Sequence, residues 1–91
     1  MNWLERIKFT ARLRRFRKKD RHEIEFIENN VTAGQTVFDI GAHKGGYTGH
    51  LRQCIGETGL LVCFEPQIAL ARYLQKLVSI HEWGNVEVRN V

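Results

Sequence analysis

The sequence has little that would place it in a membrane or in a disulfide-bonded class. Its 91 residues include two cysteines and one proline, and no apolar run approaches the roughly 20 residues that a bilayer-spanning helix needs. No uninterrupted apolar segment follows the basic N-terminal stretch, so the pattern of a secretory signal is missing. We therefore expect a cytoplasmic protein with one small domain at most.

The two cysteines also lack the spacing of a functional site. Cys54 and Cys63 lie in apolar local sequence and match neither metal-ligand nor CxxC spacing. We expect both to be reduced, partly buried and to act as small apolar side chains, rather than as a disulfide or a nucleophile. No metal site is expected.

Positive charge is concentrated near the N-terminus. Residues 5–21 carry nine Lys or Arg residues and two acidic ones, whereas residues 22–91 carry five basic and eight acidic ones. The formal net charge of +4 therefore comes from the N-terminal segment. We expect residues 1–21 to form a basic helical arm and residues 22–91 to form the domain behind it.

The arm has two apolar faces. Residues 3–19 contain no Gly or Pro, and as a helix they would group Trp3, Leu4, Ile7 and Ala11 on one side and Phe9, Leu13 and Phe16 nearly opposite. This pattern favours two short helices or a bent one. The simplest role is a solvated helical extension whose aromatic residues cover part of the domain. The alternative is attachment to anionic lipid or nucleic acid, and Trp3, Phe9 and Phe16 among cations would suit a membrane surface.

The rest of the chain alternates helix and strand patterns. Asp20 and Glu23 have capping-box spacing, with Asp in the Ser/Thr role, and predict a helix that starts near Arg21 and ends at residues 29–34. The patterns that follow predict strands at 36–40, 60–64 and 86–91 and helices at 47–55 and 67–80. Five consecutive apolar residues at 60–64 indicate a strand buried on both faces. The order predicts an α/β fold, namely a Rossmann-like half (β-α-β-α-β, parallel three-stranded sheet) preceded by N-terminal helices.

Two features lie at the carboxyl ends of neighbouring predicted strands, where this fold binds its ligand. Residues 39–48 read Asp-Ile-Gly-Ala-His-Lys-Gly-Gly-Tyr-Thr. Gly41 allows a sharp turn and lets a ligand reach bare backbone, while Gly45 and Gly46 let the helix begin close against the strand. Glu65 lies 24 residues after Gly41, where a carboxylate can accept two hydrogen bonds from ribose hydroxyls.

Together these features predict a nucleoside-containing ligand, although a glycine loop alone often marks only a tight turn. A dinucleotide fingerprint would have glycine at position 43, where this chain has His43. A side chain there would obstruct a pyrophosphate at the helix start, so the loop suits a ligand without one. A nicotinamide cofactor is the weaker alternative.

These residues resemble a known group of enzymes. The segment 37–48 resembles motif I of class I methyltransferases, in particular the D-x-G-A-x-x-G-x-Y-T form of the FkbM family. Residues 64–66, Phe-Glu-Pro, resemble that family's F-E-P after the second strand, and Asn-Val at 85–86 is similar too. The resemblance covers residues 22–91. It implies S-adenosylmethionine as cofactor and methyl transfer, usually to an oxygen of a sugar or other small molecule.

The resemblance also implies roles for single residues. Gly41 and Ala42 would face the methionine part of the cofactor, Asp39 would orient its amino end, and Glu65 would hold the ribose. His43 stands where the family often has Asn, and Gly46 where a larger side chain is common. The full cofactor-binding set is Asp39, Gly41, Ala42, His43, Gly45, Tyr47, Thr48, Glu65 and Pro66.

No catalytic residue follows from the sequence. We interpret His43 as a loop residue that contacts cofactor or water rather than as a base, and Tyr47 as a residue that packs or flanks the cofactor. His50 and His81 are expected at the surface. Family members take the acceptor wall and the base largely from sequence beyond the third strand, and this chain ends at Val91. We therefore expect an N-terminal methyltransferase portion that is inactive alone. The alternative is a small basic protein that binds anionic membrane or nucleic acid on a Rossmann-like scaffold.

We predict that the 91-residue chain is marginally stable and aggregates or pairs with another copy. The strand at 37–40 has one unpaired edge and apolar helix faces lack their usual cover. Sedimentation at increasing concentration checks this, and a monomer with a cooperative thermal transition at high concentration would contradict it. The purified chain is also expected to transfer no methyl group from labelled cofactor.

Overall fold

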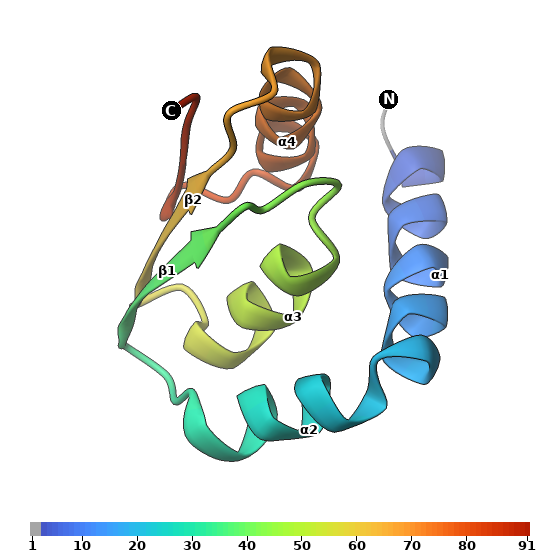
Figure 1. Ribbon diagram of the computed structural model, residues 1–91, viewed down its shortest axis with the longest axis vertical. Helices are drawn as coiled ribbons and strands as arrows, with labels where there is room; N and C mark the ends of the chain where they lie inside the picture. The colour runs from blue at the N-terminus through green and yellow to red at the C-terminus, as the bar shows by residue number, and fades with distance from the viewer. Residues whose placement is uncertain (1–2) are drawn as a thin grey trace.

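The computed structural model describes residues 3–91 (Figure 1). Its elements, in chain order, are α1 (Trp3–Lys19), α2 (Arg21–Asn30), β1 (Thr36–Ile40), α3 (Gly46–Ile55), β2 (Leu60–Phe64), α4 (Ile68–His81) and β3 (Val86–Arg89). The strands form one parallel sheet in the order β1-β2-β3. The predicted α/β fold, with N-terminal helices before a parallel three-stranded sheet, is therefore confirmed.

The helices lie to one side of β1 and β2 (Figure 1). Because successive strand residues point to opposite faces, Asp39 is buried on the helix side, whereas Phe38 and Ile40 on the other face are exposed. Within residues 3–91, β1 is also an edge strand with only β2 beside it. Self-association through this edge stays a prediction.

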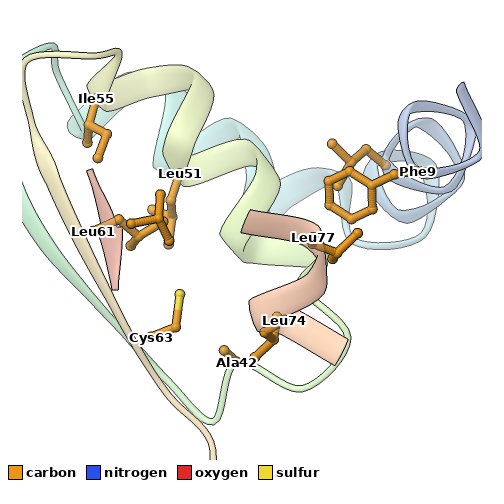
Figure 2. Packing of buried hydrophobic residues seen from close by; sticks show 10 residues of the cluster. Phe9, Ala42, Leu51, Ile55, Leu61, Cys63, Leu74 and Leu77 are labelled. Atoms are coloured by element: carbon orange, nitrogen blue, oxygen red, sulfur yellow. The ribbon is translucent and has the colours of Figure 1, made fainter. Parts of the chain in front are cut away.

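The hydrophobic core lies between the sheet and the helices (Figure 2). It takes residues from five elements and the glycine loop: Phe9, Leu13, Ala42, Leu51, Ile55, Leu61, Cys63, Leu74, Leu77 and Val86. The three middle residues of β2 are buried, which confirms the prediction made from the apolar run at 60–64. The core therefore begins in α1 and extends through α3 and α4 to β2 and β3.

The prediction of two short helices or a bent one at residues 3–19 is wrong. α1 is a single helix from Trp3 to Lys19, with Phe9 and Leu13 buried and Trp3 and Ile7 exposed. A straight helix can carry two apolar faces because only one of them packs on the protein. The next helix, α2, begins at position 21. The segment before it is nevertheless part of the domain, because Phe9 of α1 is only 3% exposed and belongs to the core.

Two glycines of α3 allow α1 to pack closely. A Cβ on Gly49 would lie 2.7 Å from the δ-carbons of Leu13, and one on Gly46 would lie 2.6 Å from the ring of Phe16. Carbon atoms do not approach so closely in a packed interior, so side chains at these positions would push α1 away. The ring of Phe16 thus occupies the space that a larger residue at position 46 would need.

Asp20 precedes α2 as expected, but the predicted capping interaction is wrong. Its side chain makes no capping hydrogen bond, and its carboxylate accepts a hydrogen bond from Tyr47 Oη at 3.1 Å instead. Tyr47 of α3 therefore takes the place of the backbone N–H groups at the start of α2. It can do so because α1 and α2 meet beside the start of α3. Ile24, which is fully buried, holds α2 in place.

The expectation that His50 and His81 lie at the surface is wrong for His50 and only partly right for His81. His50 is buried under α1, with Nε2 at 3.2 Å from the carbonyl oxygen of Leu13. Within the described chain its Nδ1 has no hydrogen-bond partner. His81 is half-buried and stacks on Trp83 with ring centroids 4.6 Å apart. Both departures arise because α1 covers this side of the molecule.

The third strand is shorter than predicted. β3 ends at Arg89, and the amide of Asn90 donates to the carbonyl oxygens of Glu65 and Pro66 at 2.8 and 2.9 Å. This side chain takes the place of a ladder hydrogen bond at the end of β2. The chain therefore leaves the strand before Val91, which corrects the expectation that it stops inside it.

The packing of α1 predicts that Phe9→Ala destabilises the whole domain. Removing a buried phenyl ring leaves a cavity and costs about 3 kcal/mol or more in unfolding free energy, whereas Trp3→Ala on the exposed face should change it by less than about 0.5 kcal/mol. Urea unfolding followed by circular dichroism measures both variants. Equal midpoints for the two would contradict an integral α1.

Candidate functional site

The loop after β1 crosses the end of β2. The backbone N–H groups of Gly41 and Ala42 both donate to the carbonyl oxygen of Phe64, at 2.8 and 3.1 Å. Gly41 has a φ of +72°, a conformation that favours glycine. A Cβ at this position would meet no heavy atom within 4 Å. The turn therefore requires glycine, and it leaves open space beside the backbone.

Glu65 joins this loop to the end of β2. Its carboxylate is only 2% exposed and accepts hydrogen bonds from the N–H of His43 at 2.8 Å and of Gln67 at 2.9 Å. The glycine turn and the carboxylate thus meet at the same edge of the sheet. A carboxylate has about four acceptor positions, so two remain after these bonds. The role of Glu65 in holding a ribose stays a prediction.

His43 has an unusual backbone conformation. Its φ is +56°, in the left-handed region that costs a non-glycine residue roughly 1–2 kcal/mol. Asn tolerates this region better than most residues, which gives a physical reason for Asn at this place in the family that the motif resembles. The side chain of His43 is exposed, and its backbone is held by Glu65.

Asp39 and Thr48 tie the start of α3 to the end of β1. Both are buried, and Thr48 Oγ1 donates to Asp39 Oδ2 at 2.6 Å. Burial raises the pKa of Asp39 above its usual value; the bond from Thr48 opposes this shift, and the charge of Glu65 adds to it. The predicted contact of Asp39 with the amino end of a cofactor stays a prediction.

A pocket of about 420 Å³ opens beside the glycine loop, a size typical of small-molecule sites. Its lining comes from two parts of the chain: Arg12, Phe16 and Asp20, and the loop residues Gly41, Ala42, His43, Lys44, Gly46 and Tyr47. Four of the nine predicted residues, Gly41, Ala42, His43 and Tyr47, are therefore brought together here. The lining does not include the other five: Asp39, Gly45, Thr48, Glu65 and Pro66.

Arg12 is a site residue that the sequence did not indicate. Its guanidinium donates to the carbonyl oxygen of Lys44 and to Tyr73 Oη and lies 5.1 Å from the ring centroids of both Phe9 and Tyr73. These contacts connect α1 to the glycine loop and to α4. The apolar face of Phe9, Leu13 and Phe16 was visible in the sequence, and it could have placed α1 against the two glycines of α3.

Tyr47 closes the pocket towards α2. Its hydroxyl donates to Asp20, and the ring of Phe16 meets its ring edge-on at 4.9 Å. Burial and the neighbouring charge of Asp20 raise the pKa of Tyr47, so the phenol stays protonated at neutral pH. This agrees with a packing role and gives no support to Tyr47 as a base.

The predicted purpose of Gly45 and Gly46 needs correction. They were expected to bring the helix close to its own strand, but both face helices. Gly45 lies against Leu74 and Leu77 of α4, and Gly46 lies against Phe16 of α1. The loop is therefore held between two helices that are distant in sequence.

The cysteines behave as expected. Both are free; Cys63 is fully buried and Cys54 is half-buried. Burial raises the pKa of the Cys63 thiol to about 11 and also raises that of Cys54. Neither forms a thiolate at neutral pH, so neither is a nucleophile.

Among residues 3–91, no group of three or more His, Cys, Asp or Glu residues is placed to hold a metal ion. The helices in the same range include none with the length and apolar character needed to cross a bilayer.

Three solved structures that resemble this fold carry methyltransferase descriptions. An S-adenosylmethionine-dependent O-methyltransferase from Thermotoga maritima aligns with 77% of this chain at 18% identity and a TM-score of 0.68. A proposed rRNA methylase from Clostridium thermocellum aligns with 77% at 22% identity and 0.72, and an S-adenosylmethionine-dependent methyltransferase from Aquifex aeolicus with 79% at 26% identity and 0.67. The chain therefore has the Rossmann-like fold of these enzymes.

The alignments cover only part of those proteins. The chain spans 28% of the Thermotoga maritima protein and 38% of each of the other two. No family model matches the sequence, and no curated protein matches it. The likeness therefore concerns the fold of this portion.

The raised pKa of Asp39 predicts how its removal changes stability with pH. Its ionised form is disfavoured in the folded protein, so its ionisation lowers the unfolding free energy as pH rises from the unfolded-state pKa, about 3.9, through the folded-state pKa. Asp39→Asn keeps an oxygen that accepts from Thr48 and carries no charge. We expect the unfolding free energy of this variant, relative to the native chain, to increase as pH rises above about 4 and through the folded-state pKa.

Urea unfolding at several pH values measures this difference. Thr58→Ser in the exposed turn before β2 serves as a control with no expected pH dependence. A difference for Asp39→Asn that is constant, or that decreases with pH, would show that the carboxyl group is not disfavoured in its charged form.

Proposed function

We propose that this chain is the cofactor-binding portion of an S-adenosylmethionine-dependent methyltransferase of FkbM type, which methylates an oxygen of a sugar or other small molecule. One observation carries the proposal: the glycine turn at Gly41 and the carboxylate of Glu65 meet at one edge of the sheet, beside a pocket of about 420 Å³. The methyltransferase fold of the solved neighbours supports it.

The chemistry of the pocket suits this cofactor. Arg12 and Lys44 bring positive charge and Asp20 brings negative charge to the same cavity, which matches the carboxylate and ammonium groups of a methionine end. Phe16 and Tyr47, which contact each other edge-on, add aromatic surface to the pocket lining. Open space beside Gly41 leaves room for a ligand against bare backbone.

A dinucleotide suits the site less well. The second glycine of its fingerprint would stand at position 43, and here a histidine holds the left-handed backbone that glycine adopts freely. His43 lines the pocket together with Gly46 at the start of α3. A pyrophosphate at that helix start would have to displace it.

In the proposed reaction, bound S-adenosylmethionine supplies a methyl group that is already activated on a sulfonium. The residues of this chain bind and orient. Glu65 fixes the loop through the N–H of His43, Arg12 fixes the Lys44 end of the same loop, and Phe16 with Tyr47 excludes water from one wall. Alignment of this kind is the main requirement of methyl transfer. We assign neither the acceptor site nor the base to residues of this chain.

The proposal predicts that the folded chain binds S-adenosylhomocysteine and that Glu65→Gln weakens this binding. A charge-assisted hydrogen bond contributes about 1.5–3 kcal/mol, so losing one between Glu65 and a ribose hydroxyl should raise Kd roughly 10- to 100-fold. Glu57→Gln, at an exposed turn residue, is the control and should leave Kd unchanged. Calorimetric titration, with circular dichroism to confirm folding, makes the measurement.

The rival ligand is tested in the same experiment. NAD is expected to bind more weakly than S-adenosylhomocysteine. Tighter binding of NAD, or no binding of S-adenosylhomocysteine to a chain whose helix content is intact, would overturn the proposal.

A further inference from the structure

The side of α1 turned away from the protein carries both apolar and cationic residues. With 100° between successive helical residues, one arc lies opposite Phe9 and Leu13, and we call it the outer face of α1: Trp3, Leu4, Ile7, Ala11, Arg14, Arg15 and Lys18. Trp3, Leu4 and Ile7 are 57%, 49% and 55% exposed. In Figure 1, α1 forms one border of the part of the chain that the structure describes.

The cations of α1 and its junction with α2 fall into three groups. Three pair with carboxylates: Arg6 with Glu82, Arg17 with Glu28 and Arg21 with Glu25. Arg12 is turned towards Lys44 and Tyr73. The remaining five are exposed and form no ion pair within residues 3–91: Lys8, Arg14, Arg15, Lys18 and Lys19. The unpaired charge therefore lies on and beside the outer face.

We infer that the outer face of α1 docks on an anionic phospholipid bilayer, with the helix lying in the plane of the interface. The apolar end, with Trp3, Leu4 and Ile7, would enter the boundary between headgroups and acyl chains, as in other amphipathic surface helices. The cations that follow, Arg14, Arg15 and Lys18, would lie among the anionic headgroups. An anionic bilayer explains both features of the outer face, because its headgroups attract the cations and its acyl chains accept the exposed apolar side chains.

The structure changes which residues face the lipid. Phe9 is part of the core and Phe16 lies over Gly46, so neither is available, although the sequence suggested both. Trp3 remains, joined by Leu4 and Ile7. Nucleic acid explains only half of the outer face, because a phosphate backbone attracts the cations but gives the aliphatic side chains no apolar surface to enter.

Docking in this orientation would bring the pocket near the membrane. The opposite side of α1 supplies Arg12 and Phe16 to the pocket, and a helix with its side chains is about 10 Å across. The inference does not depend on the proposed cofactor, since it concerns the outer face alone.

Sedimentation with vesicles tests the electrostatic part. The chain should bind vesicles that contain phosphatidylserine in phosphatidylcholine, and it should not bind pure phosphatidylcholine. Binding should be lost when salt is raised from about 0.1 M to about 1 M, where the Debye length falls from about 10 Å to about 3 Å. Each cation near such a surface contributes about 1 kcal/mol, so the triple variant Arg14→Gln, Arg15→Gln and Lys18→Gln should bind roughly 100-fold more weakly.

A matched control separates the outer face from net charge. Neutralising Arg72, Lys76 and Arg89 removes the same charge from α4 and β3, and Arg72→Gln, Lys76→Gln and Arg89→Gln together should leave affinity within about 3-fold. Equal losses for the two triple variants would mean that total charge, and not α1, governs binding, and would overturn the inference.

A second set of variants tests the apolar part. Trp3→Ala, Leu4→Ala and Ile7→Ala together keep good helix formers and should weaken binding roughly 10-fold or more, because apolar burial is lost. Ile68→Ala, at an exposed apolar residue of α4, should have no effect. In a Trp83→Phe background, the emission of Trp3 should shift to the blue on anionic vesicles.

Three further outcomes contradict the inference. The first is equal binding to neutral and anionic vesicles, and the second is absence of binding by the folded chain. The third is displacement of the chain from vesicles by RNA, combined with an unchanged affinity of the variant that lacks Trp3, Leu4 and Ile7. The last outcome would identify nucleic acid as the partner of the cations.

Discussion

Two backbone N–H groups from different loops, those of His43 and Gln67, donate to the same buried carboxylate, that of Glu65. A buried charge is costly without such partners, so the carboxylate holds both loops where they can reach it. The turn at Gly41 is fixed from the other side by the carbonyl oxygen of Phe64. The open backbone of the site exists because these bonds connect the ends of two neighbouring strands.

The second constraint is the close approach of α1 to α3. Gly46 and Gly49 leave no Cβ between the helices, and Phe16 and Leu13 fill the space. In this position Arg12 of α1 donates hydrogen bonds to Tyr73 Oη and to the carbonyl oxygen of Lys44 in the glycine loop. The basic segment is thus a wall of the pocket on one side and an exposed apolar and cationic surface on the other, which is why one helix enters two separate proposals.

Much of the fold could be predicted locally. The β-rich runs, the helical spacing between them and the glycine loop before position 47 gave the element order and the parallel sheet, because these signals act over a few residues. Three of the errors share one cause. His50 was expected at the surface, residues 3–19 were expected to bend, and Asp20 was expected to cap α2; each depends on where α1 packs. That position is a contact between distant segments, which local pattern does not encode.

The sequence alone determined that Gly41 and Glu65 end neighbouring strands, since parallel strands joined by helices must bring their carboxyl ends to one edge. It also determined the two-faced pattern of residues 3–19. Only the tertiary structure decided which face is buried, and with it that Arg12, Phe16 and Asp20 complete the pocket. The choice depended on the fit of aromatic and aliphatic side chains into gaps above two glycines, and steric fit of this kind exists only once both helices are in place.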